Sequence, residues 1–384
     1  MRIACLAVSR IPSRSANSIR VMKVAQALVR LGHEVDLWYP GRRPAPPWAD
    51  LRRHYGLSVE FRLHPTPGLS GLRRWDTSLR AVVESSRRAP DLFYVWSYQA
   101  AAALSVLGRP TLFEIHDRPA GAFGPLLFRL FLRGGGARRL LVITDALRAW
   151  LATRYGAPLR EPFVVITPSG VDLEPYDDLP EPEEARRRLG WPQRLTVSYT
   201  GHLYPGRGLD LLTELARRNP EVAFVWAGGE SNAVDAWRRR LADQRIANVR
   251  LLGFVPQVDL PLIHAASDVL VMPYEHAIAV SSGGDTSAFA SPMKAFEYLA
   301  AGRALLSSDL PVLREVLDDE NAILLPPQAV DAWDAALRRV ASDPEQRARL
   351  GRRARQEARR YSWLERTRRA IEGLGPRADG ERGR

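Results

Sequence analysis

Two oppositely charged side chains, Lys294 and Glu297, stand three positions apart in the segment SPMKAFEYLAAG, residues 291–302. We expect a helix here, with Ser291 as its N-cap and Pro292 as its first residue, where a missing backbone N–H is tolerated. Residues three apart share a helix face, and the free N–H groups of the first turn carry partial positive charge. The segment therefore predicts an anion site with a carboxylate one turn further in.

A second candidate is the turn TGHLYPGRG, residues 200–208, which directly follows an apolar run. Its three glycines would let the backbone approach a phosphate closely, and the Arg207 guanidinium offers a fixed fork of donors. The helix that opens near Leu209 would add its dipole. Taken alone, the pattern fits equally well a tight turn with a surface arginine.

Two further apolar runs also end in small or polar residues. One ends in AGGE (227–230), with Glu230 as a sugar or ribose contact, and the other in GFVP (253–256), where Phe254 and Val255 could meet a base edge. The ends of parallel strands lie on one edge of a sheet, so these segments should gather with Arg207 and Lys294, whose cations suit a diphosphate. With Glu297 as an acceptor for two vicinal hydroxyls, the set favours a nucleoside-diphosphate ligand.

The elements that must position these residues follow a strand–helix rhythm. Continuous rather than alternating apolar runs, separated by helical patterns, are typical of parallel sheets buried on both faces. In the first helix Ser18 is expected to be the cap. Strands are predicted at 3–8, 34–39, 59–63, 92–96, 111–115, 140–143, 163–166, 195–199, 222–226, 249–252, 269–272 and 304–307.

This rhythm predicts an α/β protein with two doubly wound, Rossmann-like domains. A first domain at 1–168 is followed by a linker at 169–192, where proline and acidic residues are dense. A second domain spans 193–360 and carries the candidate site. Residues 361–384 are predicted to form a helix that packs back toward the first domain and a frayed tail.

The composition excludes several classes of protein. Cys5 is the only cysteine, so no internal disulfide forms and a reducing cytoplasm is expected. The start MRIACLAVSR lacks the apolar core of a signal peptide, and no run reaches the ~20 apolar residues that span a bilayer. The net charge of +12 would suit nucleic acid, but the 55 basic residues are spread along the chain and only Lys23 and Lys294 are lysines. An arginine-rich solvated surface is favoured, and no nucleic-acid partner is expected.

The motifs TGHLYPGRGLDLL, AGGE, GFVP and SPMKAFEYLAAGRALLSSDLPVLREVL, in this order, closely resemble the donor half of the family-four (group 1), retaining, GT-B-fold glycosyltransferases. The first half resembles the same family through ANSIRVMKVAQALVRLGHEV, EIHD and VITPSGVDLEPY. The resemblance implies a GT-B fold, with two domains facing each other across a cleft, and transfer of a sugar from a nucleoside-diphosphate sugar to an acceptor hydroxyl. No cofactor is implied.

The resemblance also implies roles for individual residues. Arg207 and Lys294 would hold the donor diphosphate, and Glu297, the second glutamate of the family's Glu-x7-Glu motif, would hold the ribose. His116 of EIHD is similar to the active-site histidine near the transferred sugar. Asn17 and Ser18 would lie in the first βα loop that closes over the donor, and Phe254 and Val255 would lie against the base. The other expected donor contacts are Gly201, His202, Glu230, Ser291 and Met293.

Two positions depart from the family pattern and resemble its SPxKxxEY variant. Phe289 stands where the first glutamate is expected, so the donor sugar must be held by another group, either Asp285 or the backbone of 287–291. His202 stands where many relatives carry an arginine, which leaves Arg207 and Lys294 as the phosphate cations. Retention is implied by the resemblance alone. No Asp-x-Asp pair suits a metal, so metal-independent transfer is expected. No carboxylate stands out as a nucleophile, which favours a same-face displacement over a covalent glycosyl intermediate.

Several alternatives stay open. His116 could be a buried structural histidine, and Lys294 and Glu297 could form an exposed ion pair of little energetic weight. The whole chain could be a nucleotide-sugar epimerase of the same architecture, a sugar-nucleotide binding module, or a nucleic-acid-binding protein.

The apolar and basic stretch at 123–139 also has two interpretations. It could be a core helix of the first domain, or a helix on an anionic membrane surface that presents a lipid-linked acceptor. A glycan or a small-molecule acceptor is equally compatible with the sequence. The expected location is cytoplasmic. If the stretch at 123–139 binds a membrane, the protein would also contact the inner face of that membrane.

Overall fold

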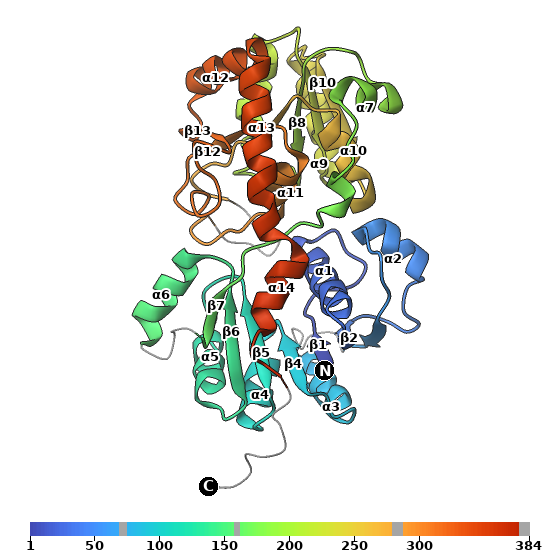
Figure 1. Cartoon of the computed structure of the whole chain (residues 1–384), viewed down its shortest axis with the longest axis vertical. Coiled ribbons are helices and arrows are strands. Elements are labelled where there is room, and N and C mark those ends of the chain that lie inside the picture. Colours follow the sequence, from blue (N-terminus) through green and yellow to red (C-terminus); the bar gives the residue numbers. More distant parts are fainter. Residues whose placement is uncertain (69–74, 157–161, 279–286, 376–384) are drawn as a thin grey trace. The chain divides into compact units, whose positions relative to one another are not determined.

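The structure, a computed structural model, describes residues 1–68, 75–156, 162–278 and 287–375 (Figure 1). The chain divides into two compact units. Unit 1 comprises Met1–Ser169 together with Trp363–Arg384, and unit 2 comprises Gly170–Ser362. Each unit is built on its own parallel sheet, which confirms the predicted pair of doubly wound α/β domains.

Unit 1 contains a seven-stranded parallel sheet in the order β3-β2-β1-β4-β5-β6-β7. Its strands are β1 (Arg2–Leu6), β2 (Glu34–Pro40), β3 (Arg62–Thr66), β4 (Leu92–Val95), β5 (Thr111–Ile115), β6 (Ala137–Val142) and β7 (Val164–Ile166). Its helices are α1 (Ala16–Arg30), α2 (Trp48–Tyr55), α3 (Trp75–Ser86), α4 (Tyr98–Val106), α5 (Gly124–Arg133), α6 (Asp145–Tyr155) and α14 (Trp363–Ile371), the last of which packs against α1.

Two sequence predictions in unit 1 were wrong. The third strand lies at Arg62–Thr66 rather than at 59–63, because Arg62 and His64 both bind the carboxylate of Asp36 on the neighbouring β2, at 3.0 and 2.5 Å. Such polar pairing is invisible to an apolar-run criterion. The cap of α1 is Ser15, whose Oγ accepts a hydrogen bond from the backbone N–H of Ser18 at 3.3 Å.

Unit 2 contains a six-stranded parallel sheet in the order β10-β9-β8-β11-β12-β13. Its strands are β8 (Thr196–Thr200), β9 (Ala223–Ala227), β10 (Val249–Gly253), β11 (Val269–Met272), β12 (Ala304–Ser308) and β13 (Ile323–Leu325). Its helices are α7 (Pro182–Leu189), α8 (Leu209–Arg218), α9 (Ser231–Asp243), α10 (Leu260–Ala265), α11 (Met293–Ala301), α12 (Val330–Ser342) and α13 (Pro344–Ala358). In this unit α13 lies beside α11, as Figure 1 shows.

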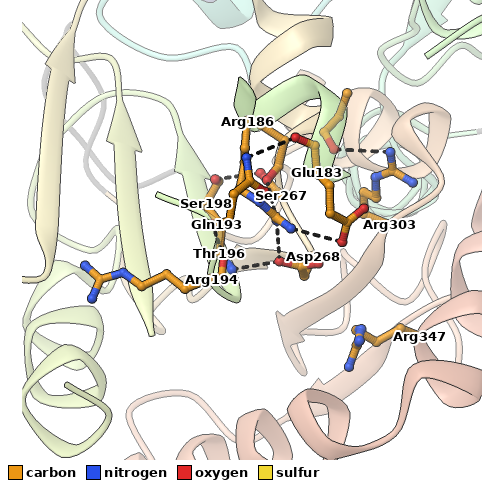
Figure 2. A network of polar contacts seen from close by, with 12 residues as sticks. Glu183, Arg186, Gln193, Arg194, Thr196, Ser198, Ser267, Asp268, Arg303 and Arg347 are labelled. Carbon is orange, nitrogen blue, oxygen red and sulfur yellow. Dashed lines mark hydrogen bonds and ion pairs between the residues drawn. The ribbon is translucent and has the colours of Figure 1, made fainter. Parts of the chain in front are cut away.

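All but the first residue of the segment predicted as a linker, 169–192, belongs to unit 2. It forms helix α7, and a buried arginine of that helix, Arg186, pairs with Asp268 at 2.7 Å. The same carboxylate accepts the backbone N–H of Thr196 at 2.8 Å, as the network in Figure 2 shows. Thr196 begins β8 and Asp268 directly precedes β11, so this network fastens α7 to the amino-terminal edge of the sheet. Proline and acid density marked the start of a helix here rather than a flexible connection.

Candidate active site

The carboxyl ends of β8 and β11 lie next to each other in the middle of the unit 2 sheet. The strand order runs outward from β8 to β10 on one side and from β11 to β13 on the other, so the direction of winding reverses between β8 and β11. Ligands of doubly wound sheets bind at the carboxyl ends of the strands at such a reversal. The segment 201–208 follows β8, and Lys294 and Glu297 lie on α11, the helix after β11.

Two glycines of the 201–208 segment allow a close approach. Gly208 has φ +73°, and a Cβ there would lie 1.8 Å from the carbonyl oxygen of Pro273 in the segment after β11. Gly201 has φ +141°, and a Cβ there would lie 2.8 Å from the Nζ atom of Lys294. Only glycine adopts such conformations without strain and leaves this space open. The glycine turn therefore packs against the neighbouring loop and makes room for an ammonium group.

Lys294 is a buried cation with 8% of its surface exposed. Its Nζ atom lies 3.8 Å from the ring centroid of Tyr199 and 5.1 Å from that of Tyr274. Within the described part of the chain, Nζ has no hydrogen-bond partner. Burial and repulsion from Arg207 hold the pKa of Lys294 well below its ordinary value, against the opposing attraction of Glu297. The alternative of an exposed ion pair between Lys294 and Glu297 was therefore wrong.

Arg207 is the second cation at this edge. Its guanidinium carbon lies 4.8 Å from the ring centroid of Tyr274, the same ring that Lys294 approaches. Tyr274 follows β11, and Tyr199 is the fourth residue of β8. Two aromatic rings from adjacent strand ends thus support two cations without neutralising either, because a ring face attracts a cation but carries no net charge.

The helix that carries Lys294 and Glu297 starts later than predicted. Helix α11 begins at Met293, and Pro292 occupies the N-cap position with extended backbone (φ −72°, ψ 124°) and no side-chain cap bond. Ser291 is therefore not the N-cap. Met293 supplies the first helical position, Lys294 the second, and the half-buried Glu297 lies three residues after Lys294.

The other predicted donor contacts in unit 2 also follow strand ends. His202 stacks on Tyr204 with ring centroids 4.7 Å apart, and its backbone oxygen accepts the Tyr199 hydroxyl at 2.7 Å. Glu230 directly precedes α9, and Phe254 and Val255 directly follow β10; all three are half-buried. The sheet therefore places every described member of the set on its carboxyl-terminal edge.

In unit 1, Asn17 and Ser18 do not lie in a loop. Both belong to the first turn of α1, where Ser18 is fully buried and its Oγ donates to the carbonyl oxygen of Ser13 at 2.7 Å. The amide nitrogen of Asn17 donates to Ser9 Oγ at 2.8 Å. The prediction that these two residues lie in a loop was wrong, because the helix is capped three residues earlier than expected. Their contact with the donor stays a prediction.

His116 lies just after β5 and is bound to a carboxylate. Its Nε2 atom is 2.8 Å from Oε1 of Glu114, and a quarter of its side chain is exposed. Glu114 itself is fully buried and pairs with Arg366 of α14 at 2.7 Å. Burial, together with the positive charge of Arg20, lowers the pKa of His116 to about 4, so the imidazole is neutral at pH 7.

Two family models together match most of the chain. Residues 18–175 match the model described as Glycosyltransferase Family 4, and residues 181–357 match the model described as Glycosyl transferases group 1. The chain belongs to this family of GT-B-fold glycosyltransferases. The predicted resemblance is thereby confirmed for the family and for the fold.

Sequence relatives of this family member include two kinds of enzyme. The chain is 30% identical over 250 residues to a D-inositol 3-phosphate glycosyltransferase from Kineococcus radiotolerans, covering 59% of the chain and 54% of the relative. It is 27% identical over 234 residues to a phosphatidyl-myo-inositol mannosyltransferase from Mycolicibacterium smegmatis, covering 58% and 53%. The chain thus spans about half the length of the curated relatives it matches.

Solved structures share the fold over nearly the whole chain. Anabaena HepE in complex with UDP-glucose has a TM-score of 0.74 at 17% identity, covering 97% of this chain and 99% of that one. Sucrose-phosphate synthase from Thermosynechococcus elongatus has a TM-score of 0.72 at 18% identity, covering 95% and 96%. At these identities the similarity concerns the fold alone.

One departure of this chain from the family pattern lies among the described residues. Phe289, at the position of the first motif glutamate, is buried, and its phenyl ring has no carboxylate with which to accept hydrogen bonds from the donor sugar. Asp285, one of its two predicted replacements, lies outside the described residues.

Sequence reasoning missed Glu114, which binds His116, and Arg366, which binds Glu114. Glu114 carried a usable signal, since it is a carboxylate inside the otherwise apolar strand TLFEI, residues 111–115. Arg366 carried none, because it is 252 residues away in sequence and one of many arginines. The rings of Tyr199 and Tyr274, which lie against Lys294 and Arg207, were missed as well. In the sequence each tyrosine is an ordinary residue at a strand end.

The part of the chain that the structure describes contains neither a candidate metal cluster nor a helix that could span a membrane. In the ranges 1–68, 75–156, 162–278 and 287–375, no three His, Cys, Asp or Glu side chains gather as a candidate metal site. None of the helices in these ranges is long and apolar enough to cross a membrane.

Proposed function

We propose that this chain transfers a sugar from a nucleoside-diphosphate sugar to an acceptor hydroxyl, with the donor held by unit 2. The observation that carries the proposal is the Lys294 ammonium, which is buried and has no hydrogen-bond acceptor among the described residues. Burying an unpaired charge is costly, so such a group is typical of a site completed by an anion. A diphosphate supplies that anion, and Arg207 beside it supplies a second cation.

The reaction breaks the bond between the anomeric carbon and the diphosphate oxygen and forms a bond from that carbon to the acceptor oxygen. The acceptor proton passes to the departing diphosphate. Negative charge grows on the diphosphate in the transition state, where fixed cations in a dry site stabilise it most. We assign this task to Lys294 and Arg207, with retention of configuration and without a metal. Glu297, three residues after Lys294 on α11, would accept hydrogen bonds from the ribose hydroxyls.

The names of the relatives support a choice of donor and acceptor class. Structures of Anabaena HepE hold UDP and UDP-glucose, and the sequence relatives are named for inositol phosphate and phosphatidylinositol substrates. We propose a nucleotide sugar as the donor and a glycolipid or glycan precursor as the acceptor.

Helix α5 supports a lipid-linked acceptor. Phe128 and Phe131 are buried, as in a core helix, whereas Phe123, Leu126 and Leu130 are 59%, 53% and 39% exposed. Arg129 and Arg133 on the same helix are also exposed. Exposed apolar side chains flanked by cations suit an anionic membrane surface. We expect the wild-type protein to float with vesicles that contain anionic lipid at low salt, and the Leu126→Ser/Leu130→Ser variant to stay unbound. Wild-type protein that does not float would refute the membrane contact.

The first test is thermal unfolding with a panel of uridine, guanosine and adenosine diphosphates and their sugars. A ligand that binds only the folded state, present at 100 times its Kd, stabilises it by about 2.7 kcal/mol. At least one nucleotide should raise the unfolding temperature, and Glu297→Ala should remove most of the shift. Glu345→Ala, which removes an exposed glutamate from the first turn of α13, is the control that should keep it. No shift with any of the three nucleotides would refute the donor site.

Product analysis separates transfer from epimerisation. A transferase joins the sugar to an added acceptor and releases the nucleoside diphosphate, whereas an epimerase inverts a sugar carbon without needing an acceptor. NMR of the product's anomeric proton reports retention, and undiminished turnover in excess chelator reports metal independence. Inverted product, or turnover abolished by chelator and restored by a divalent cation, would contradict those two parts of the proposal.

A further inference from the structure

A cluster of polar side chains surrounds Glu114 in unit 1 and determines how His116 can bond. Glu114 is fully buried at the end of β5. Its Oε1 accepts a hydrogen bond from Arg366 Nη2 at 2.7 Å, and its Oε2 accepts the hydroxyl of Tyr94 on β4. The guanidinium of Arg20 on α1 lies 4.0 Å from Oε1. Three elements other than its own strand thus direct donors or positive charge at one carboxylate.

These neighbours keep Glu114 ionised. Burial alone would raise the pKa of its carboxyl, but Arg366, His116 and Arg20 outweigh burial and hold that pKa well below the ordinary range. An ionised carboxylate can only accept hydrogen bonds. The contact between Glu114 Oε1 and His116 Nε2, at 2.8 Å, therefore requires the proton to lie on Nε2.

The other ring nitrogen of His116 is then defined as well. The imidazole is neutral at pH 7, since burial and the charges of Arg20 and Arg366 outweigh the attraction of Glu114. A neutral ring with its proton on Nε2 carries a lone pair on Nδ1. Among the described residues, the hydrogen bond between His116 and Glu114 uses Nε2 and not Nδ1. A quarter of the His116 side chain is exposed.

We propose that Glu114 and Arg366 fix His116 as the Nε2–H tautomer, so that its Nδ1 atom presents a hydrogen-bond acceptor to a hydroxyl group of a bound ligand. Arg366 and Glu114 are positioning residues in this scheme, because they act through His116 and not on the ligand. A lone pair selects for a hydroxyl or another donor and repels phosphate oxygen. His116 would thus hold a sugar or acceptor hydroxyl and not the diphosphate. The identity of the ligand, but not the tautomer, rests on the proposed function.

The tautomer can be measured without any ligand. NMR of protein labelled with 13C and 15N at histidine distinguishes Nε2–H, Nδ1–H and doubly protonated rings, and His116→Asn assigns the signal among the 7 histidines. We expect the neutral Nε2–H form at pH 7. An Nδ1–H or doubly protonated His116 would overturn the proposal.

A matched pair of substitutions tests the positioning role of Arg366. Arg366→Lys keeps a cation beside Glu114, whereas Arg366→Met removes it. Arg366→Met should shift the His116 signals and raise the pH at which His116 titrates, because the positive charge of Arg366 lowers the pKa of His116. Arg366→Lys should restore both at least in part. If Arg366→Met fails to fold, the wild-type tautomer and the Lys variant still decide the matter. Identical His116 spectra and titrations in wild type and a folded Met variant would exclude a positioning role.

A second matched pair tests the outward atom. The amide of His116→Asn replaces the Nδ1 position, and the amide of His116→Gln replaces the Nε2 position that faces Glu114. Loss of one hydrogen bond to the ligand should lower ligand preference or the transfer rate about five- to tenfold. We expect the full loss in the Gln variant, whereas the Asn variant should keep part of the wild-type value. Equal function in both variants and wild type would overturn the hydroxyl contact.

The same Gln variant identifies the hydroxyl. If it belongs to the transferred sugar, the preference for the nucleotide sugar over the bare nucleoside diphosphate should fall about five- to tenfold. If it belongs to the acceptor, that preference should stay and the transfer rate at saturating donor should fall. A protein that binds no nucleotide would refute the proposed function, while the NMR spectrum would still decide the tautomer.

Discussion

Replacing Lys294 with Met should stabilise the ligand-free protein while abolishing its response to nucleotide. Met has nearly the length of Lys and no charge, so the change removes the ammonium and leaves the packing against Tyr199 in place. The wild-type protein keeps this cation buried, with no hydrogen-bond acceptor among the described residues. An arrangement that is unfavourable without ligand and favourable with it is expected of a binding site and not of a stabilising contact.

The size of the effect follows from two opposing contributions. Desolvation of a buried ion costs several kcal/mol even after relaxation. The ring contacts at 3.8 and 5.1 Å return about 2 kcal/mol, the value for a desolvated cation over an aromatic ring. The net gain on substitution is therefore about 1 to 3 kcal/mol. For a unit of 193 residues (362 − 170 + 1), this corresponds to a rise in unfolding temperature of roughly 2 to 12 °C.

The pH dependence supplies an independent check of the same reasoning. The pKa of Lys294 is lowered by burial and by Arg207, so the native state loses this proton at a lower pH than the unfolded chain does. In the interval between the two pKa values the unfolded chain binds more protons, and wild-type stability rises with pH. The Met variant lacks this group. Its advantage over wild type should therefore be largest at low pH and shrink as pH rises.

The assay is thermal or urea unfolding of wild type and Lys294→Met, with and without the nucleotide that stabilises wild type. Lys23→Met is a matched control, because Lys23 is the only other lysine and is equally buried, but its Nζ donates to the Gly56 carbonyl oxygen at 2.7 Å. The control should be destabilised and should keep its response to nucleotide. A Lys294→Met protein less stable than wild type at neutral pH, or one still stabilised by nucleotide, would refute the reasoning.

Three further predictions concern the scaffold of the site. Gly201→Ala places a Cβ 2.8 Å from Lys294 Nζ at a φ of +141°, so it should lower stability by about 1 to 3 kcal/mol and remove the thermal shift with nucleotide; an unchanged shift would contradict the close contact. Arg186→Met leaves Asp268 without its buried partner and should lower the free energy of unfolding, measured in urea, by about 3 to 5 kcal/mol. Nucleotide affinity, measured by calorimetry on the folded protein, should stay unchanged. A change in affinity would connect this network to the site. Burial lowers the pKa of His264 from 6.5 to about 3, so between these two pH values only the unfolded chain takes up this proton. Stability should therefore fall by roughly 2 kcal/mol from pH 7 to pH 5 in wild type. An equally steep fall in the His264→Asn variant would exclude His264 as its source.

The fold class could be predicted because its signal is local. Parallel strands buried on both faces must be continuously apolar, and β11 and β5 were placed to the residue by that criterion alone. The criterion failed where polar pairing took its place, as in the edge strand Arg62–Thr66. Proline and acid density, which predicted a linker at 169–192, also misled, because a buried arginine, Arg186, joins that segment to Asp268, 82 positions away.

The candidate site divides in the same way. Sequence alone determined which residues could serve it, because a glycine turn, an arginine and a lysine–glutamate pair at strand ends are types and spacings suited to a diphosphate and a ribose. Only the tertiary structure decided their environment. Strand order brings Tyr199 and Tyr274 together beneath Lys294 and Arg207, and α14 brings Arg366 to Glu114. Charges and tautomers depend on the distances between groups and on their burial. Those distances and that burial are set only when segments far apart in the chain have packed together.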